Sequence, residues 1–190
     1  MALNAAVFLD KDGTLVHDLP YNVDPARVVL RDDAGVALAR LQAAGFRLIV
    51  VSNQPGVAHG YFPESALAAV WIVLQQQLAE QGVGLTAIYY CPHHPAGREA
   101  RYALRCDCRK PQPGMLLRAA AEHGIDLAAS WMVGDILDDV EAGSAAGCRS
   151  VLLDVGSETE WRPGAAREPD FVAGELSAAA EYIVGQRRAA

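Results

Sequence analysis

Short apolar segments alternate along the chain with longer segments whose apolar residues recur every three or four positions. The short segments predict strands at residues 5–10, 47–52, 85–90, 130–134 and 149–153, and a brief last strand at 170–172. The longer segments predict helices at residues 33–44, 63–81, 113–123, 136–146 and 175–184. Because strands and helices alternate and the strands are apolar throughout, we expect a doubly wound α/β fold with a parallel sheet covered on both faces.

Length and composition favour one domain over residues 1–190. A chain of 190 residues with 52% hydrophobic residues can bury a full core without disulfides. The net charge of −7 disfavours nucleic acid or an anionic membrane as a partner. No cationic apolar leader and no apolar run of membrane-spanning length stands out, so we expect a soluble cytoplasmic protein.

Ligands of doubly wound sheets bind beyond the carboxyl ends of the strands. Two long irregular segments, 16–30 and 91–111, lie near such ends, and loops of that length are usually functional. The segment 156–169 has the composition of an ordinary surface loop.

The segment FLDKDGTL, residues 8–15, places two carboxylates directly after the first strand. Asp10, at the strand end, is a candidate nucleophile toward phosphorus, and Asp12 is a candidate general acid and base. The alternative is a simple turn in a surface loop, but the preceding strand and the following Thr-Leu favour the functional interpretation.

Two further strand ends carry polar residues. Ser52, Asn53 and Gln54, in VVSNQPG, offer uncharged donors that can hold a phosphate, although the same residues also form ordinary turns. In MVGDILDD, Asp135 follows a strand and predicts, with Asp10, an oxygen site for Mg²⁺. The adjacent Asp138 and Asp139 either assist that site or are acids in a helix's first turn, where the helix dipole favours them.

Lysine is rare in this chain. Of the 16 basic residues only Lys11 and Lys110 are lysines, so each is a candidate for a place that needs a compact ammonium. Lys110, beside Arg109 at the end of the second long segment, suits a phosphoryl group or a carboxylate. The alternative for both is a solvated surface residue or chance.

Cysteine and histidine cluster between residues 91 and 108. Three of the four cysteines and two of the five histidines lie there, which favours a metal over unrelated buried cysteines. Cys91, His93, Cys106 and Cys108 form a closed tetrahedral set for a structural zinc. His93 is preferred to His94 because the spacing is then the same on both sides, and Cys148 is expected in the core.

These motifs, in this order, resemble the haloacid dehalogenase (HAD) superfamily of aspartate-nucleophile phosphatases. FLDKDGTL, VVSNQPG, CRKP and MVGD are similar to its four signature motifs. CPHHP and CDCRKPQPGM resemble more closely the group of D,D-heptose 1,7-bisphosphate 7-phosphatases and related histidinol-phosphatase domains. The similarity runs from about residue 5 to 153, with Ile136 and the segment 16–24 departing from the group's usual pattern.

The resemblance implies a role for each matching residue. Asp10 would be the nucleophile and a magnesium ligand, Asp12 the acid/base with its carbonyl on magnesium, and Asp135 the third magnesium group. Ser52, Asn53, Gln54 and Lys110 would surround the phosphoryl group, Arg109 would reach another part of the substrate, and Asp18 and Tyr21 would line the sugar site.

The resemblance also implies a function. We expect a monomeric Mg²⁺-dependent phosphatase without a cap domain, because the length leaves no room for one. It would remove the 7-phosphate of D-glycero-D-manno-heptose 1,7-bisphosphate through an aspartyl-phosphate. The alternatives are a phosphatase for histidinol phosphate or another small molecule, a phosphotransferase, and a non-catalytic zinc-loop binding module. The last is disfavoured by the joint presence of Asp10, Asp12, Lys110 and Asp135.

Overall fold

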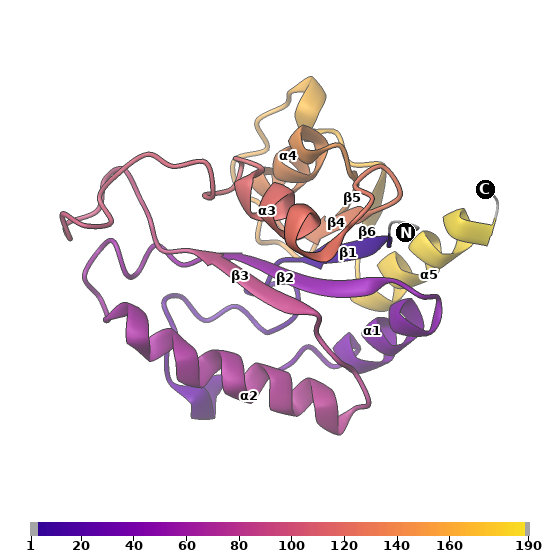
Figure 1. Ribbon diagram of the computed structural model, residues 1–190, viewed down its shortest axis with the longest axis horizontal. Coiled ribbons are helices and arrows are strands. Elements are labelled where there is room, and N and C mark those ends of the chain that lie inside the picture. The colour runs from indigo at the N-terminus through magenta and orange to yellow at the C-terminus, as the bar shows by residue number, and fades with distance from the viewer. Residues whose placement is uncertain (1–3, 189–190) are drawn as a thin grey trace.

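A six-stranded parallel sheet forms the centre of the computed structural model, which describes residues 4–188 (Figure 1). The strands lie in the order β3-β2-β1-β4-β5-β6. Their bounds are β1 Ala6–Leu9, β2 Arg47–Asn53, β3 Ala87–Cys91, β4 Trp131–Gly134, β5 Arg149–Leu153 and β6 Phe171–Ala173. All six predicted strands and the parallel pairing are confirmed.

Within residues 4–188, five α-helices accompany the sheet, as the periodicity predicted. They are α1 Ala34–Ala43, α2 Leu67–Glu80, α3 Gly114–His123, α4 Leu137–Ala146 and α5 Leu176–Arg188. Two bounds differ from the prediction by more than one residue. The first turn predicted for α2 is a 3-10 turn over Glu64–Ala66. Helix α5 continues past residue 184, where Arg187 donates a hydrogen bond to the carbonyl of Ala44 and stacks on Phe46.

The helices cover both faces of the sheet. Helices α1, α2 and α5 pack on one face, and α3 and α4 pack on the other (Figure 1). The chain moves outward from β1 to β2 and β3, then crosses back to β4 and moves outward in the other direction. Because the order reverses between β1 and β4, the carboxyl ends of these two strands flank the crevice where such folds bind ligands.

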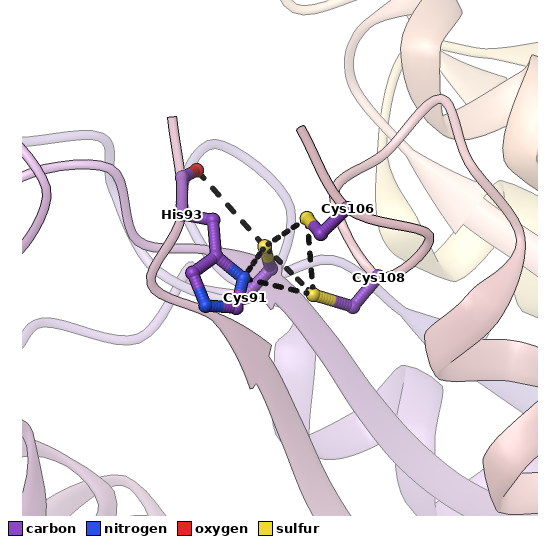
Figure 2. Close-up of side chains that lie close together, drawn as sticks. All are labelled: Cys91, His93, Cys106 and Cys108. Carbon is purple, nitrogen blue, oxygen red and sulfur yellow. Dashed lines mark hydrogen bonds between the residues drawn. The ribbon is translucent and has the colours of Figure 1, made fainter. Parts of the chain in front are cut away.

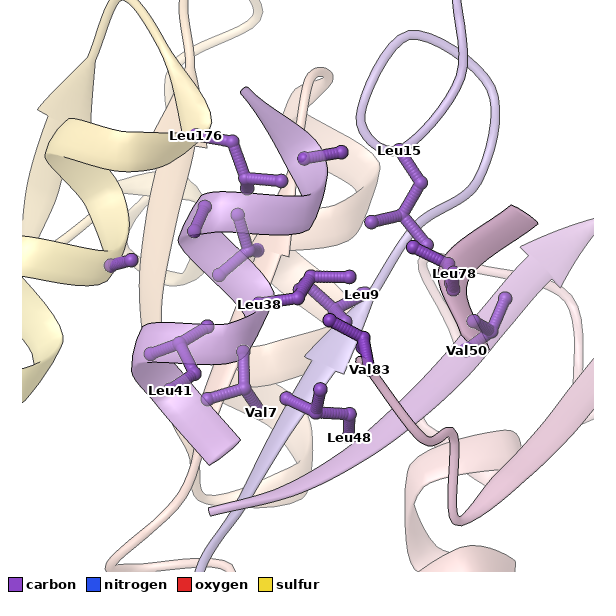
Figure 3. Close-up of a cluster of buried hydrophobic side chains, with 14 of the residues drawn as sticks. Val7, Leu9, Leu15, Leu38, Leu41, Leu48, Val50, Leu78, Val83 and Leu176 are labelled. Carbon is purple, nitrogen blue, oxygen red and sulfur yellow. The ribbon is translucent and has the colours of Figure 1, made fainter. Parts of the chain in front are cut away.

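Alternation along β1 and β2 separates two apolar cores. Val7, Leu9, Leu48 and Val50 point toward α1, α2 and α5, where they pack with Leu38 and neighbouring helix residues (Figure 3). The intervening side chains, such as those of Phe8 and Ile49, pack under α3 and α4. No helix in residues 4–188 combines the length and apolar character needed to cross a membrane.

The first prediction concerns the larger core. Leu38 on α1 is fully buried, so Leu38→Ala should lower the free energy of unfolding by about 2–5 kcal/mol through lost burial and a residual cavity. Val36, on the same helix, is 73% exposed, and Val36→Ala should change it by less than about 0.5 kcal/mol. Urea unfolding of both variants measures the difference, and equal losses would contradict this core assignment.

Candidate active site and metal centre

Three buried carboxylates meet at the crevice between β1 and β4. Asp10 follows β1 and Asp135 follows β4, and the main-chain N–H of Asp10 donates to the carbonyl of Val133 at 3.0 Å. Asp139, on α4, joins them, and one oxygen of each carboxylate lies within 4.8 Å of the others. Gly13 allows the Asp135 carboxylate to lie close to the main chain after β1, because a Cβ at position 13 would lie 1.9 Å from Oδ2 of Asp135.

Lys110 places a buried ammonium group beside these carboxylates. Its Nζ lies 2.5 Å from Oδ1 of Asp10 and 2.6 Å from Oδ1 of Asp139, and it donates to the carbonyl of Val51 at 2.8 Å. Burial opposes its charge, but Asp10 and Asp139 outweigh this effect and hold the pKa of Lys110 above its usual value. Lys110 therefore remains a cation although its side chain is only 2% exposed.

One ammonium does not balance three carboxylates. Burial, with the charges of Asp10 and Asp139, raises the pKa of Asp135 to about 7. A group of carboxylate oxygens with excess negative charge is the donor set that a hard divalent cation such as Mg²⁺ takes. The residues present thus fit the predicted magnesium site.

The sequence did not decide whether Asp138 or Asp139 assists the metal site, and the two side chains lie in different surroundings. Asp139 faces Lys110 within the carboxylate group, whereas Asp138 pairs with Arg167 at 2.8 Å. Asp139 also accepts a hydrogen bond from the main-chain N–H of Ile136 and so caps α4. The structure therefore adds Asp139, and not Asp138, to the residues of the site.

Asp12 lies outside the group of three carboxylates and lines a separate small pocket. Its Oδ1 lies 2.8 Å from Nζ of Lys11, and its Oδ2 accepts a hydrogen bond from Nε2 of Gln54 at 3.1 Å. The pocket, of about 190 Å³, is also lined by Asp18 and Tyr21, the two residues that the resemblance assigned to a sugar site. Burial raises the pKa of Asp12, while Lys11 acts in the opposite direction.

Polar residues at the end of β2 form hydrogen bonds with one another and with the main chain of Lys110. The side-chain amide of Gln54 also donates to Oγ of Ser52 at 2.9 Å. Asn53 forms two hydrogen bonds with the main chain of Lys110, accepting from its N–H at 3.0 Å and donating to its carbonyl at 3.1 Å. Asn53 thereby fixes the position of Lys110, a contact that its place in the sequence did not predict.

Arg109 lies beside Lys110 in a second pocket of about 320 Å³, which His94 and Arg105 also line. Among residues 4–188, the buried NH1 nitrogen of Arg109 has no hydrogen-bond partner. Burial and the nearby charges of Arg109 and His59 lower the pKa of His94. The pocket therefore places a guanidinium beside Lys110, close to the carboxylate site.

The predicted zinc ligands converge in one cluster (Figure 2). The sulfur atoms of Cys91, Cys106 and Cys108 lie 3.0–3.5 Å apart, and Nδ1 of His93 lies 3.7 Å from Cys91 and 3.4 Å from Cys108. Tetrahedral zinc with bonds of about 2.3 Å separates its sulfur ligands by roughly 3.8 Å, so a small expansion accommodates the ion. Hydrogen bonds from Cys91 and His93 lower the pKa of Cys108 to about 5, and thiolate is the form that binds metal.

The segment 91–108 packs on the chain that follows β2. The main-chain N–H groups of Arg98 and Glu99 donate to the carbonyl of Ala58 at 2.7 and 2.9 Å, and the hydroxyl of Tyr102 donates to Glu64 at 2.7 Å. His94 lies against His59, with ring centroids 4.7 Å apart. The segment 91–108 is thus held against the chain that follows β2.

The loop after β5 is more closely tied to the site than its composition suggested. Glu158 accepts a hydrogen bond from the main-chain N–H of Leu137 at 2.7 Å, at the beginning of α4. Arg167 pairs with Asp138 and, at 2.9 Å, with Glu141. This loop therefore holds α4, the helix that carries Asp139. The sequence did not predict these contacts, because the loop is a polar segment without a motif.

Comparisons with known proteins agree with this geometry. The model of the HAD-hydrolase-like family matches residues 107–179. The chain is 40% identical over 185 residues to the D-glycero-β-D-manno-heptose-1,7-bisphosphate 7-phosphatase of Escherichia coli strain K12, covering 97% of this chain and 96% of that protein. It is 40% identical over 179 residues to the protein of the same name in Yersinia pestis, covering 94% and 89%.

A solved structure is similar over almost the whole chain. The D,D-heptose 1,7-bisphosphate phosphatase of B. bronchiseptica, complexed with magnesium and phosphate, superposes with a TM-score of 0.77 at 30% identity. The match covers 97% of this chain and 99% of that one. The doubly wound fold predicted from the sequence is thus shared with a phosphatase that binds magnesium.

The second prediction concerns zinc. Protein purified without added metal should contain about one zinc per chain, because the four ligands already lie within coordinating reach of one position. Cys108→Ser should remove most of this zinc. Cys148→Ser is the matched control, since Cys148 packs in the core under α3 and α4 and should leave the zinc content unchanged. Metal analysis with thiol titration decides, and metal-free protein with all thiols titratable would refute the site.

Proposed function

Because the chain belongs to the D-glycero-β-D-manno-heptose-1,7-bisphosphate 7-phosphatase family of HAD-like hydrolases, we propose that it removes the 7-phosphate from this sugar bisphosphate and leaves the 1-phosphate. The observation that carries the proposal is the buried group of Asp10, Asp135, Asp139 and Lys110 at the reversal point of the sheet. This group combines a candidate nucleophile, a cation for a phosphoryl group and a site for Mg²⁺.

In this proposal Asp10 takes the phosphoryl group covalently. A carboxylate oxygen of Asp10 attacks phosphorus, and the bond from phosphorus to the sugar oxygen breaks. Asp12 gives its proton to that leaving oxygen and then takes a proton from water, whose oxygen attacks the aspartyl-phosphate. Inorganic phosphate and the carboxylate of Asp10 result, so both acids return to their starting states.

The other residues position and neutralise the phosphoryl group. Asp10, Asp135 and the main-chain carbonyl of Asp12 would hold Mg²⁺, which supplies positive charge against the phosphoryl oxygens. Lys110 and the buried hydroxyl of Ser52 would bind those oxygens directly. Asn53 contributes by holding the main chain of Lys110.

Arg109 and the zinc set would govern the rest of the substrate. The guanidinium of Arg109, which lines a pocket together with Lys110, is a suitable donor for the second phosphate. Four protein ligands leave zinc no open position for water, so zinc would be structural. It would stiffen the segment that ends at Arg109.

The third prediction identifies the substrate. With Mg²⁺, the protein should release one phosphate from heptose 1,7-bisphosphate, and phosphorus NMR should show the 1-phosphate remaining. We expect the β anomer to react faster than the α anomer, in line with the names of the relatives. Histidinol phosphate, assayed in parallel, should give a much lower kcat/KM. A higher value for histidinol phosphate would favour the alternative substrate, and no phosphate release from any ester would refute phosphatase activity.

The fourth prediction separates the two acids after β1. Asp10→Asn removes the nucleophile, so no phosphoenzyme should form with any substrate. Asp12→Asn keeps the nucleophile but loses acid/base assistance, so turnover of the sugar phosphate should fall by ~10²–10⁴-fold. An aryl phosphate needs little acid assistance in the first step, so phosphoenzyme should accumulate in Asp12→Asn alone.

Acid quench followed by intact mass spectrometry measures that phosphoenzyme. A phosphorylated Asp10→Asn protein would show that another residue is the nucleophile. Full activity of Asp12→Asn on the sugar phosphate would exclude Asp12 as the acid and base.

A further inference from the structure

Lys11 is a buried cation that the proposed mechanism does not use. It lies between Asp10 and Asp12 in the sequence and is one of only two lysines in the chain. Lys11 is only 3% exposed, and its Nζ lies 5.4 Å from the ring centroid of Trp71 on α2. Burying an ammonium is unfavourable unless a partner compensates it, so its partner indicates what it does.

That partner is Asp12. Nζ of Lys11 lies 2.8 Å from Oδ1 of Asp12, while Nε2 of Gln54 holds Oδ2 at 3.1 Å and is itself bonded to Ser52. Both oxygens of the proposed acid/base are therefore held, each by a different segment of chain. This arrangement fixes the carboxylate toward the pocket of Asp18 and Tyr21, on the side where the sugar would leave.

Lys11 is the cation that lies beside the Asp12 carboxylate, with its Nζ 2.8 Å from Oδ1. A general acid must both carry a proton and release it, so a cation beside it stabilises the group that remains after release. Trp71 restricts Lys11 to this place, because the ammonium lies over its ring.

We propose that Lys11 is a positioning residue for catalysis, which holds the Asp12 carboxyl toward the leaving oxygen and stabilises the carboxylate left when the proton moves to that oxygen. This inference depends on the proposed phosphatase function. The positive charge at position 11 matters more than the shape of the side chain. An arginine could replace Lys11, because the pocket of Asp12 offers space and a guanidinium can also stack on Trp71.

The fifth prediction compares Lys11→Met and Lys11→Arg with two esters in single-turnover experiments. With the sugar phosphate, Lys11→Met should slow phosphoenzyme formation at least ~10-fold while KM stays within about 3-fold. With an aryl phosphate, which needs little proton donation, the rate should stay within about 3-fold. Lys11→Arg should recover most of the lost rate because it restores the positive charge.

Arg40→Met is the matched control. It removes one positive charge from an exposed ion pair with Glu181 on α5, and both rates should be unchanged. If Lys11→Met does not give folded protein by circular dichroism, Lys11→Gln, which keeps a donor without the charge, replaces it in the same comparison.

Three outcomes would overturn the inference. An equal loss on both esters would show a structural role, and a raised KM with unchanged kcat would show that Lys11 binds substrate. Unchanged rates in Lys11→Met would show no role in catalysis. If the wild-type protein releases phosphate from neither ester, the proposed function itself fails, a result distinct from these three.

Discussion

The ion pairs of Lys110 with Asp10 and Asp139 are the interaction on which the active site depends. Three carboxylates gather at the buried crevice between β1 and β4, where their mutual repulsion would otherwise drive them apart or keep them protonated. Lys110 reaches them from the segment that precedes α3, 100 residues after Asp10. The crevice therefore exists in this form only if the segment between β3 and α3 places Lys110 accurately.

The cluster of Cys91, His93, Cys106 and Cys108 lies where a bound zinc would fix the position of Lys110. Cys91 is the last residue of β3, and Cys106 and Cys108 come directly before Arg109 and Lys110. One zinc ion would thus tie the end of an edge strand to Arg109 and Lys110, which together line the pocket of about 320 Å³. The Ala58 carbonyl and the Asn53 amide hold the same segment from the β2 side. A structural metal would in this way act on substrate binding without touching the substrate.

Sequence patterns predict the fold and most of the site because both follow from local rules. Continuous apolar strands imply a parallel sheet, and parallel strands bring Asp10, Ser52 and Asp135 to one edge. The choice between Asp138 and Asp139 is different, because adjacent residues in a helix point about 100° apart and only packing fixes the rotation. The contacts of Lys11 and Glu158 likewise depend on side-chain directions in irregular loops, which no periodicity encodes.

The charges of the site explain why it would need a divalent cation and why it has two separate ammonium groups. Asp10, Asp12, Asp135 and Asp139 carry four negative charges when ionised, against two positive charges on Lys11 and Lys110. A divalent ion would restore neutrality, so that a phosphoryl dianion could approach an anionic nucleophile. If both ammonium groups lay beside Asp10, Asp12 would have no cation to stabilise it after proton transfer. With one on each side, Lys110 would serve the phosphoryl group and Lys11 would serve the leaving group.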